Sequence, residues 1–389
     1  MAPAIVFYVS GHGFGHASRS IEVINAILAK RPEVRIGVRT SAPRWLFDLT
    51  VKGKVAFSTL ECDTGVVQVD ALSLDEADTI RRASSFHSDL VTRAASETRV
   101  LRELGAGLIV GDIPPLAFAV GASAGIPSVG LGNFTWDWIY ADYPRVRLAP
   151  SLLPTIRGAY SKASMALRLP MSGGFESFSN VRDIPFIARH ATRTREEVCK
   201  LLKLPADKPI ALASFGGYGL PSLETSNLSK FKKYTVVTTT NAPMSRARKD
   251  TPTTERKGSF VSINEEAMYD VGVRYEDLVS AAEALVTKPG YGVISECIAN
   301  DAAVLYTPRG HFPEYDVLLE EMPKYVRSAL MSQDDLFEGR WEPHLDKLLA
   351  QPKLKKKPET NGAEVAADIV LKTLDKPPKK PRGRPRAKF

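Results

Sequence analysis

Short apolar runs alternate with helical patterns through the first half of the chain. Residues Ile5–Val9 and Val34–Val38 are typical of strands. The helix expected between them has its buried face at Ile21, Ile24, Ile27 and Leu28. A later strand at Leu108–Val110 ends at Gly111-Asp112, a small-residue helix follows over PLAFAVGASAG, and IPSVGLGNF is typical of a further strand. This alternation predicts a parallel, doubly wound sheet with helices on both faces.

The same alternation restarts in the second half. The segment LPMSGGFESFSNVRDIPF, near residues 170–190, is rich in Gly, Ser and Pro and is predicted to be a linker. The strands expected after it are Ile210–Ser214, Tyr234–Thr240, Leu285–Thr287 and Ala303–Tyr306. A polar connector precedes a last helix over Ala363–Leu374. We therefore expect a first Rossmann-like domain over 1–180, a second over 188–350, and a closing helix over 362–374.

Composition agrees with a globular protein that has two ordinary domains. The 389 residues are 44% hydrophobic and 25% charged. The three cysteines, Cys62, Cys199 and Cys297, have neither a disulfide-rich nor a metal-ligand spacing. No apolar run approaches the ~18 residues that span a bilayer, and the N-terminus lacks the basic region of a signal peptide. These features predict a cytoplasmic protein.

The net charge of +8 belongs to one end of the chain. Residues 376–389, KPPKKPRGRPRAKF, hold seven basic residues and no acidic residue, so the remainder is nearly neutral. The core Pro381-Arg382-Gly383-Arg384-Pro385 resembles an AT-hook, in which glycine and flanking arginines enter the narrow minor groove of A·T-rich DNA. The alternative is a disordered basic tail that contacts any polyanion.

The first predicted strand ends in the glycine-rich loop SGHGFGHASR, residues 10–19. Glycines at positions 11, 13 and 15 allow a tight turn and a close backbone approach, and the following helix aims its free N–H groups at the same place. His12, Gly13 and Gly15 are candidates to contact a bound substrate. The alternative is a simple glycine turn with a solvated histidine.

A second glycine loop follows the strand at 285–287. Lys288, Gly290 and Gly292 suit a diphosphate, and Ser295-Glu296 follows in the next helix, where the carboxylate can accept hydrogen bonds from a ribose diol. The next strand is expected to lead to Glu314 and Asp316 as acceptors for sugar hydroxyls. Ser214, Gly216 and Gly217 in SFGGYG are expected to form a second amide cradle for the phosphates. The alternative is that Glu296 and Glu314 are exposed surface acids.

Long motifs of this chain resemble a known family. GYGVISE…TPRGHFPEYD resembles the nucleotide-sugar half of GT-B glycosyltransferases, including the MurG-like group. SGHGFGHASR, GDIPPLAFAVGASAGIPSVGLGNFTWDWIYADY and NGAEVAADIV resemble the N-terminal glycosyltransferase-like module of plant L-arabinokinases and its free-standing bacterial relatives. In the arabinokinases a sugar kinase follows this module. This chain ends instead in the basic tail, so no kinase activity is expected.

The resemblance implies a GT-B fold, with two facing Rossmann-like domains and a cleft between them. It places a UDP-sugar on the second domain and an unknown acceptor on the first. His16 matches the position of the general base, with His12 as second choice. Asp112 is the candidate carboxylate partner, because it ends a later parallel strand at the same edge of the sheet; the alternative is that it caps the helix that follows. Asp137 is a rival partner or an acceptor contact. Trp138 belongs to an aromatic run with Trp136 and Tyr140 that can stack on a sugar; the alternative is that these aromatics are core residues. No D-x-D motif is present, so neither a metal nor another cofactor is expected.

Other classes of function stay open at this point. The GT-B fold also carries sugar-nucleotide epimerases. A non-catalytic, regulatory module that binds a sugar nucleotide would use Glu296 for binding, and its function would not depend on His16. A DNA-associated adaptor would act through the basic tail.

Overall fold

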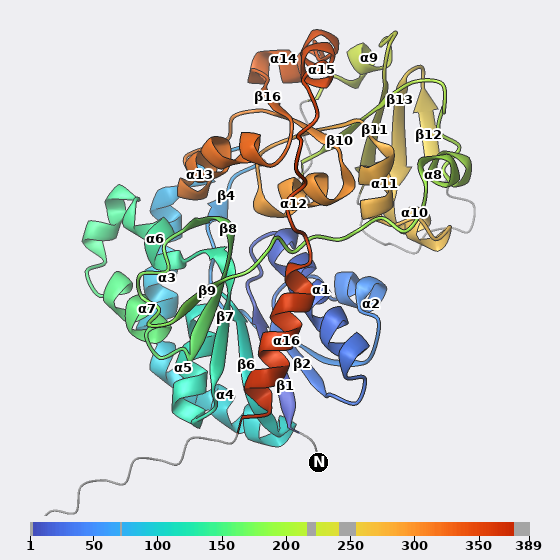
Figure 1. Cartoon of the computed structure of the whole chain (residues 1–389). Helices are drawn as coiled ribbons and strands as arrows, with labels where there is room; N and C mark the ends of the chain where they lie inside the picture. The colour runs from blue at the N-terminus through green and yellow to red at the C-terminus, as the bar shows by residue number, and fades with distance from the viewer. Residues whose placement is uncertain (1–2, 71, 216–222, 241–253, 377–389) are drawn as a thin grey trace, which may run out of the picture.

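The computed structural model describes residues 3–70, 72–215, 223–240 and 254–376. These residues form two α/β halves, which Figure 1 shows with the first half below and the second above. The first half holds a sheet of seven parallel strands in the order β3-β2-β1-β6-β7-β8-β9. Their bounds are Val55–Thr59, Ile36–Thr40, Ala4–Val9, Ala106–Asp112, Ser128–Phe134, Met165–Gly173 and Val181–Asp183.

The centre of this sheet is buried on both faces because helices cover each side. Every residue of β1 is buried, as expected for a strand in the middle of a parallel sheet. The helices are α1 (Phe14–Lys30), α2 (Arg44–Thr50), α3 (Glu76–Ser88), α4 (Leu90–Leu104), α5 (Pro115–Ala124), α6 (Trp136–Ala141) and α7 (Leu152–Tyr160). A short hairpin, β4 (Val67–Gln68) and β5 (Leu74–Asp75), lies between β3 and α3.

The second half holds the sheet β12-β13-β11-β10-β14-β15-β16. Only β12 is antiparallel, at one edge. The strands span Thr254–Lys257, Phe260–Asn264, Thr235–Thr240, Ile210–Ser214, Ala284–Thr287, Ala303–Tyr306 and Ser328–Leu330. The helices are α8 (Arg195–Leu201), α9 (Thr225–Leu228), α10 (Glu265–Asp270), α11 (Tyr275–Ala281), α12 (Tyr291–Asn300), α13 (Pro313–Glu321), α14 (Gln333–Phe337) and α15 (Glu342–Leu349).

The last helix, α16 (Gly362–Leu374), returns to the first half. It packs along α1, and Figure 1 shows it running down the lower domain. Lys30 and Arg31 at the end of α1 form ion pairs with Asp368 and Asp375 of this helix. The predicted closing helix is therefore present.

Among the described residues no helix is long and apolar enough to span a membrane, and the three cysteines are free and buried.

The predicted linker over 170–190 is wrong for residues 170–183 and right for the rest. The last four residues of β8, 170–173, and all of β9 belong to the first sheet, and the chain crosses between the halves only after Asp183. The glycines there serve packing, because an added Cβ at Gly173 would lie 2.4 Å from the ring of Trp138. The strand expected at Val34–Val38 also begins later, at Ile36. The other predicted strands are confirmed to within two residues at each end.

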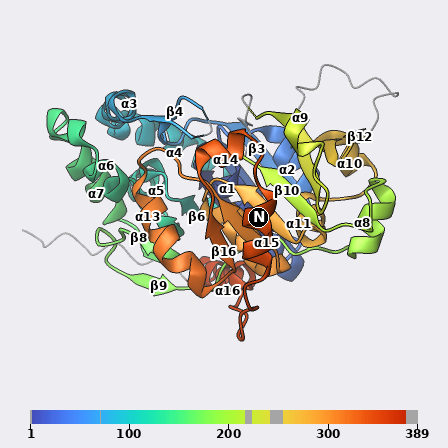
Figure 2. The same cartoon turned by 90° about the horizontal axis from the view of Figure 1, so that it is seen from above.

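The two halves meet at their glycine loops. Gly15 in the first turn of α1 faces Gly292 in the first turn of α12, and a Cβ at Gly292 would lie 3.2 Å from the Gly15 Cα. Helix α13 of the second half contacts β8 of the first, and Figures 1 and 2 both place them side by side. The carboxyl edges of both sheets therefore border one interdomain region.

Candidate active site

The loops after β1 and β6 lie side by side because these strands are neighbours. Their register pairs Val9 with Asp112 at the carboxyl edge of the sheet. The glycine loop leads from Val9 into α1, which carries His16 in its first turn. This parallel pairing brings together two residues that are 96 positions apart in the chain.

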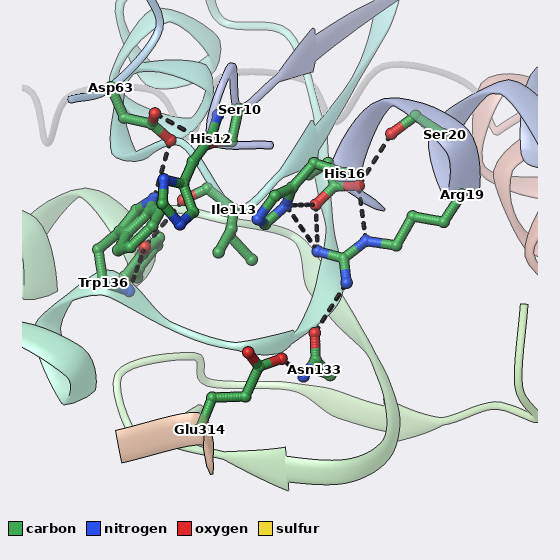
Figure 3. Close-up of polar contacts among 12 residues, drawn as sticks. Ser10, His12, His16, Arg19, Ser20, Asp63, Ile113, Asn133, Trp136 and Glu314 are labelled. Carbon is green, nitrogen blue, oxygen red and sulfur yellow. Dashed lines mark hydrogen bonds and ion pairs between the residues drawn. The ribbon is translucent and has the colours of Figure 1, made fainter. Parts of the chain in front are cut away.

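His16 and Asp112 form a buried pair, and Figure 3 draws the polar contacts around His16. The His16 Nδ1 lies 2.9 Å from the Asp112 Oδ1. The His16 side chain is 7% exposed and the Asp112 side chain is fully buried. Burial works to raise the pKa of Asp112, but the charges of Arg19 and His16 and their hydrogen bonds outweigh it and lower the pKa to about 2. Asp112 is therefore an anion at neutral pH.

A strained backbone holds Asp112 in place. The next residue, Ile113, has φ 59°, a left-handed conformation that is unfavourable for a β-branched residue. The Tyr160 hydroxyl donates to the Ile113 carbonyl at 2.8 Å. Gly132 of β7 makes room, since a Cβ there would lie 2.5 Å from a methyl group of Ile113. Strain of this kind persists at sites that need one fixed orientation.

Arg19 lies one turn after His16 and joins the pair. Its Nε donates to Asp112 Oδ2 at 2.8 Å and its Nη2 to Asp112 Oδ1 at 2.5 Å. Its Nη1 donates to Asn133 Oδ1 at 2.7 Å. The Asn133 Nδ2 in turn donates to Glu314 Oε1 at 2.6 Å, across the domain boundary. A continuous line of hydrogen bonds thus runs from Asp112 to the second domain (Figure 3).

His12 lies beside a second buried acid. Asp63 Oδ1 accepts from the Ser10 hydroxyl at 2.9 Å, and Asp63 Oδ2 accepts from the Trp136 indole at 2.8 Å. Burial raises the pKa of Asp63 to about 6. The His12 ring packs against the Trp136 ring with a centroid distance of 5.7 Å. Burial, followed by the charges of His16, Arg309 and Lys288, lowers the pKa of His12 to about 3.

The second glycine loop faces this region from the other domain. Gly290 precedes α12 as its N-cap, and the Ser295 hydroxyl donates to the Gly292 carbonyl at 2.9 Å. Burial, together with the charge of Arg309, lowers the pKa of Lys288 to about 8. Burial also lowers the pKa of Arg309, although Glu314 opposes this. Two desolvated cations therefore lie beside the start of a helix, where an anion is favoured.

Glu296 is buried rather than surface-exposed, and it has a protein partner. Arg189 Nε donates to Glu296 Oε1 at 2.6 Å, and Arg189 Nη2 lies 2.5 Å from the same oxygen. Arg189 Nη1 lies 3.5 Å from Glu276 Oε2, an oxygen that accepts no hydrogen bond from the described residues. Two buried carboxylates thus share one arginine. Burial raises the pKa of Glu296, although Arg189 works to lower it.

The remaining residues that were predicted to bind the donor differ in burial and in hydrogen bonding. Glu314 is buried and bonded to Asn133, whereas Asp316 is exposed. Both lie in the first turn of α13 and not at the end of β15. The Ser214 hydroxyl lies 2.6 Å from the Tyr275 hydroxyl at the end of β10. The predictions for Gly216 and Gly217, like those for Arg382, Gly383 and Arg384, lie outside the described residues.

Asp137 and Trp138 have their contacts elsewhere than at His12 and His16. The Asp137 Oδ2 accepts from Ser177 at 3.0 Å and from Arg157 at 3.2 Å. The Trp138 ring packs on Gly173. It is the fully buried Trp136, not Trp138, that contacts His12 and His16. Among the described residues, the partner of His16 is Asp112 and not Asp137.

Sequence reasoning missed Arg19, Asp63 and Asn133 as members of the site. Arg19 stands in the glycine loop motif itself, one helical turn after His16, and this spacing was a usable signal. Asn133 ends a predicted strand in the same way as Asp112 does. Asp63 follows the edge strand β3 by four residues in an irregular segment, and no pattern in the sequence marks it.

Comparison with solved structures defines the class of this fold. The glycotransferase of kitacinnamycin superposes with a TM-score of 0.62 at 15% identity, over 96% of this chain and 99% of that chain. UGT2 of Phytolacca americana, solved with UDP-2-fluoro-glucose and pterostilbene, gives a TM-score of 0.57 at 14% identity, over 96% and 94%. The chain therefore has the GT-B fold of glycosyltransferases, as predicted.

The sequence also has a characterised relative. L-arabinokinase of Arabidopsis thaliana is 30% identical over 379 residues, which cover 94% of this chain. The chain spans 34% of the length of that protein, and the predicted resemblance is confirmed. No protein-family model matches the chain.

Proposed function

We propose that the protein transfers a sugar from a UDP-sugar to an acceptor hydroxyl, with His16 as general base. The observation that carries the proposal is the buried His16–Asp112 pair at the carboxyl edge of the first sheet, opposite the glycine loop of the second domain. The GT-B fold supports this class of reaction, as does the likeness to UGT2, whose solved complex contains a fluorinated UDP-sugar. The proposal requires no metal ion.

In the proposed reaction His16 Nε2 removes the proton of the acceptor hydroxyl. The acceptor oxygen then bonds to the anomeric carbon while the bond from that carbon to UDP breaks. Asp112 stabilises the imidazolium that forms, because it is an anion held against Nδ1. The proton is on His16 and the negative charge is on the released UDP, so the step is balanced.

The leaving diphosphate has a binding site of suitable charge. Lys288 and Arg309 are desolvated cations near the start of α12, whose free N–H groups face the same region. A preorganised cationic site of this kind stabilises the charge that develops on the leaving group. In the part of the chain that the structure describes, neither cation forms an ion pair with a carboxylate that would compete with the diphosphate.

The ribose of the donor is assigned to the pair of carboxylates on Arg189. The two contacts from Arg189 fall on one oxygen of Glu296, and Glu276 Oε2 is without a hydrogen-bond donor among the described residues. A ribose diol offers two O–H donors, one for each carboxylate. Glu314, in the first turn of α13, is proposed to accept from hydroxyls of the transferred sugar.

Calorimetry with UDP tests the donor site. Glu296→Ala should weaken UDP binding by roughly 1.5–3 kcal/mol, because a hydrogen bond to a charged acceptor is lost. Glu296→Gln keeps the side-chain volume and should lose part of that energy. Glu320→Ala, which removes an exposed acid of the same domain, is the matched control and should bind UDP normally. Unchanged UDP affinity in both folded Glu296 variants would remove Glu296 from the donor site.

A further inference from the structure

We propose that Arg19 and Asn133 are positioning residues that make the tautomer of His16 depend on contact between the two domains. This inference rests on the proposed role of His16 as base. It starts from the line of hydrogen bonds in Figure 3 that joins Asp112, Arg19, Asn133 and Glu314. A base at Nε2 requires the proton of the neutral ring on Nδ1.

Two groups compete for His16 Nδ1. Asp112 Oδ1 lies 2.9 Å away and can only accept, whereas Arg19 Nη2 lies 2.8 Å away and can only donate. In the first arrangement Nδ1 carries the proton and Nε2 is free to act as base. In the second arrangement Nδ1 accepts from Arg19, Nε2 carries the proton, and the ring cannot take one from the acceptor.

The observed position of Arg19 favours the first arrangement. Nη2, Asp112 Oδ1 and His16 Nδ1 form a nearly equilateral triangle with sides of 2.5, 2.8 and 2.9 Å. The two hydrogens on a planar guanidinium nitrogen diverge by about 120°. In such a triangle the directions from Nη2 to Oδ1 and to Nδ1 differ by only about 60°, so Nη2 cannot point a hydrogen straight at both atoms. The shorter contact, to Asp112 Oδ1, takes the straighter of the two. His16 Nδ1 is then left to donate to the same carboxylate oxygen.

Asn133 holds the guanidinium in this position. Its side chain is fully buried between a group that only donates, Arg19, and a group that only accepts, Glu314. A neutral amide satisfies both in a single orientation, with Oδ1 toward Arg19 and Nδ2 toward Glu314. Asn133 lies at a register irregularity of β7, which breaks the regular pairing with β8 between Gly132 and Phe134.

The last bond of the line is the one that crosses between domains. Glu314 is carried by α13 of the second domain, and its buried carboxylate anchors the Asn133 amide. When the domains separate, this anchor is lost, the amide is free to rotate, and Arg19 can tilt until Nη2 donates to Nδ1. The base-competent tautomer of His16 is therefore the state of the closed molecule, which limits proton abstraction to that state.

Nitrogen-15 spectroscopy of the histidine rings in the full chain tests this directly, without nucleotide or acceptor. The six histidines are labelled, and the His16 signal is assigned with His16→Gln. The wild type should show Nδ1 protonated and Nε2 bare. Asn133→Leu and Glu314→Leu should each replace this by a mixture of both tautomers. Glu314→Gln should retain the wild-type signal, because its amide oxygen still accepts from Asn133.

Asn25→Leu is the control for a purely structural effect. Asn25 is a buried amide on the same helix as Arg19, with bonds to Thr50 O and Lys52 N, and its loss should destabilise the domain while leaving the His16 signal unchanged. If Asn133→Leu does not fold, Glu314→Leu tests the same line of hydrogen bonds, because it removes the acceptor on the second domain. A wild type protonated on Nε2, folded leucine variants with the wild-type signal, or the same change in Asn25→Leu would each overturn the proposal. A failure of UDP binding would contradict the proposed function and leave this result intact.

Discussion

His16 is a residue whose chemistry depends on one carboxylate. The Asp112 side chain is surrounded by donors, with Arg19 and Ser20 on its oxygens as well as His16. These contacts keep it ionised and fix its orientation, which in turn fixes the imidazole ring. A carboxylate held in this way can stabilise an imidazolium without taking its proton.

Removal of the imidazole should reduce turnover and leave donor binding nearly intact. His16→Ala should lower turnover by roughly 10²–10⁴, because a general base acts only in the transition state. Asp112→Asn should be impaired as well, and the loss in the double variant should be smaller than the sum of the two, since the residues work as a unit. A screen of nucleotide sugars for thermal stabilisation finds the donor. Once an acceptor is known as well, steady-state kinetics measure turnover and UDP calorimetry measures donor binding.

Two outcomes would change this assignment. Near-normal turnover in His16→Ala would move the role to His12 or remove it. A chain that binds UDP but transfers no sugar with any acceptor, and is indifferent to His16→Ala, would be a binding module.

At the scale of elements, the N-terminal ends of two helices from different domains are in contact. The first turns of α1 and α12 meet at Gly15 and Gly292, so the glycines of both loops allow a close contact of backbones. The geometry of the two positions differs. A Cβ at Gly15 would lie 3.9 Å from Gly292, which is ordinary contact, whereas a Cβ at Gly292 would lie 3.2 Å from Gly15 Cα.

This difference gives a matched pair of alanine substitutions. Gly15→Ala should leave domain closure unchanged and is expected to stabilise its helix by up to ~0.5–1 kcal/mol. Gly292→Ala should gain less stability than Gly15→Ala, because its Cβ meets the Gly15 backbone and the two first turns must move apart by a few tenths of an ångström. Thermal unfolding of the two variants measures this difference in stability. Identical unfolding temperatures of the two variants would contradict it.

At the scale of the whole molecule, the excess positive charge lies in the C-terminal tail and not in the preceding residues. The seven basic residues of 376–389 follow a body of nearly balanced charge. Their interaction with DNA is a prediction from sequence, since these residues lie outside the described part of the chain apart from Lys376. It does not depend on the proposed site.

The tail should bind A·T-rich DNA in a salt-dependent way. With about four phosphates engaged, the slope of log affinity against log salt should be near −3 to −4. A chain of residues 1–375 should bind no DNA and retain UDP binding. Competition between A·T-rich and G·C-rich duplexes at fixed salt measures specificity. Equal binding to both would leave a nonspecific polycation, and DNA binding by residues 1–375 would place the interaction on the folded body.

The sequence by itself determined the elements and their order. Periodicity located the central strands of both sheets, which are β1, β2, β6 and β7 in the first and β10, β11, β14 and β15 in the second, but not the outer strands. Because parallel strands share one edge, the meeting of His16 and Asp112 was predictable from this pattern. The glycine loops were likewise visible, because few residues other than glycine permit such turns and close approaches.

Only the tertiary structure decided which charges pair. The contact of Arg189 with Glu296 spans 107 positions, and that of Asn133 with Glu314 spans 181. The first pair depends on how the segment after the crossing packs on the second domain, and the second pair on how the two domains meet. Local periodicity carries no information about either. The glycines near 173 show the same limit, because a residue type that permits a loop also permits a tryptophan ring to pack against a strand.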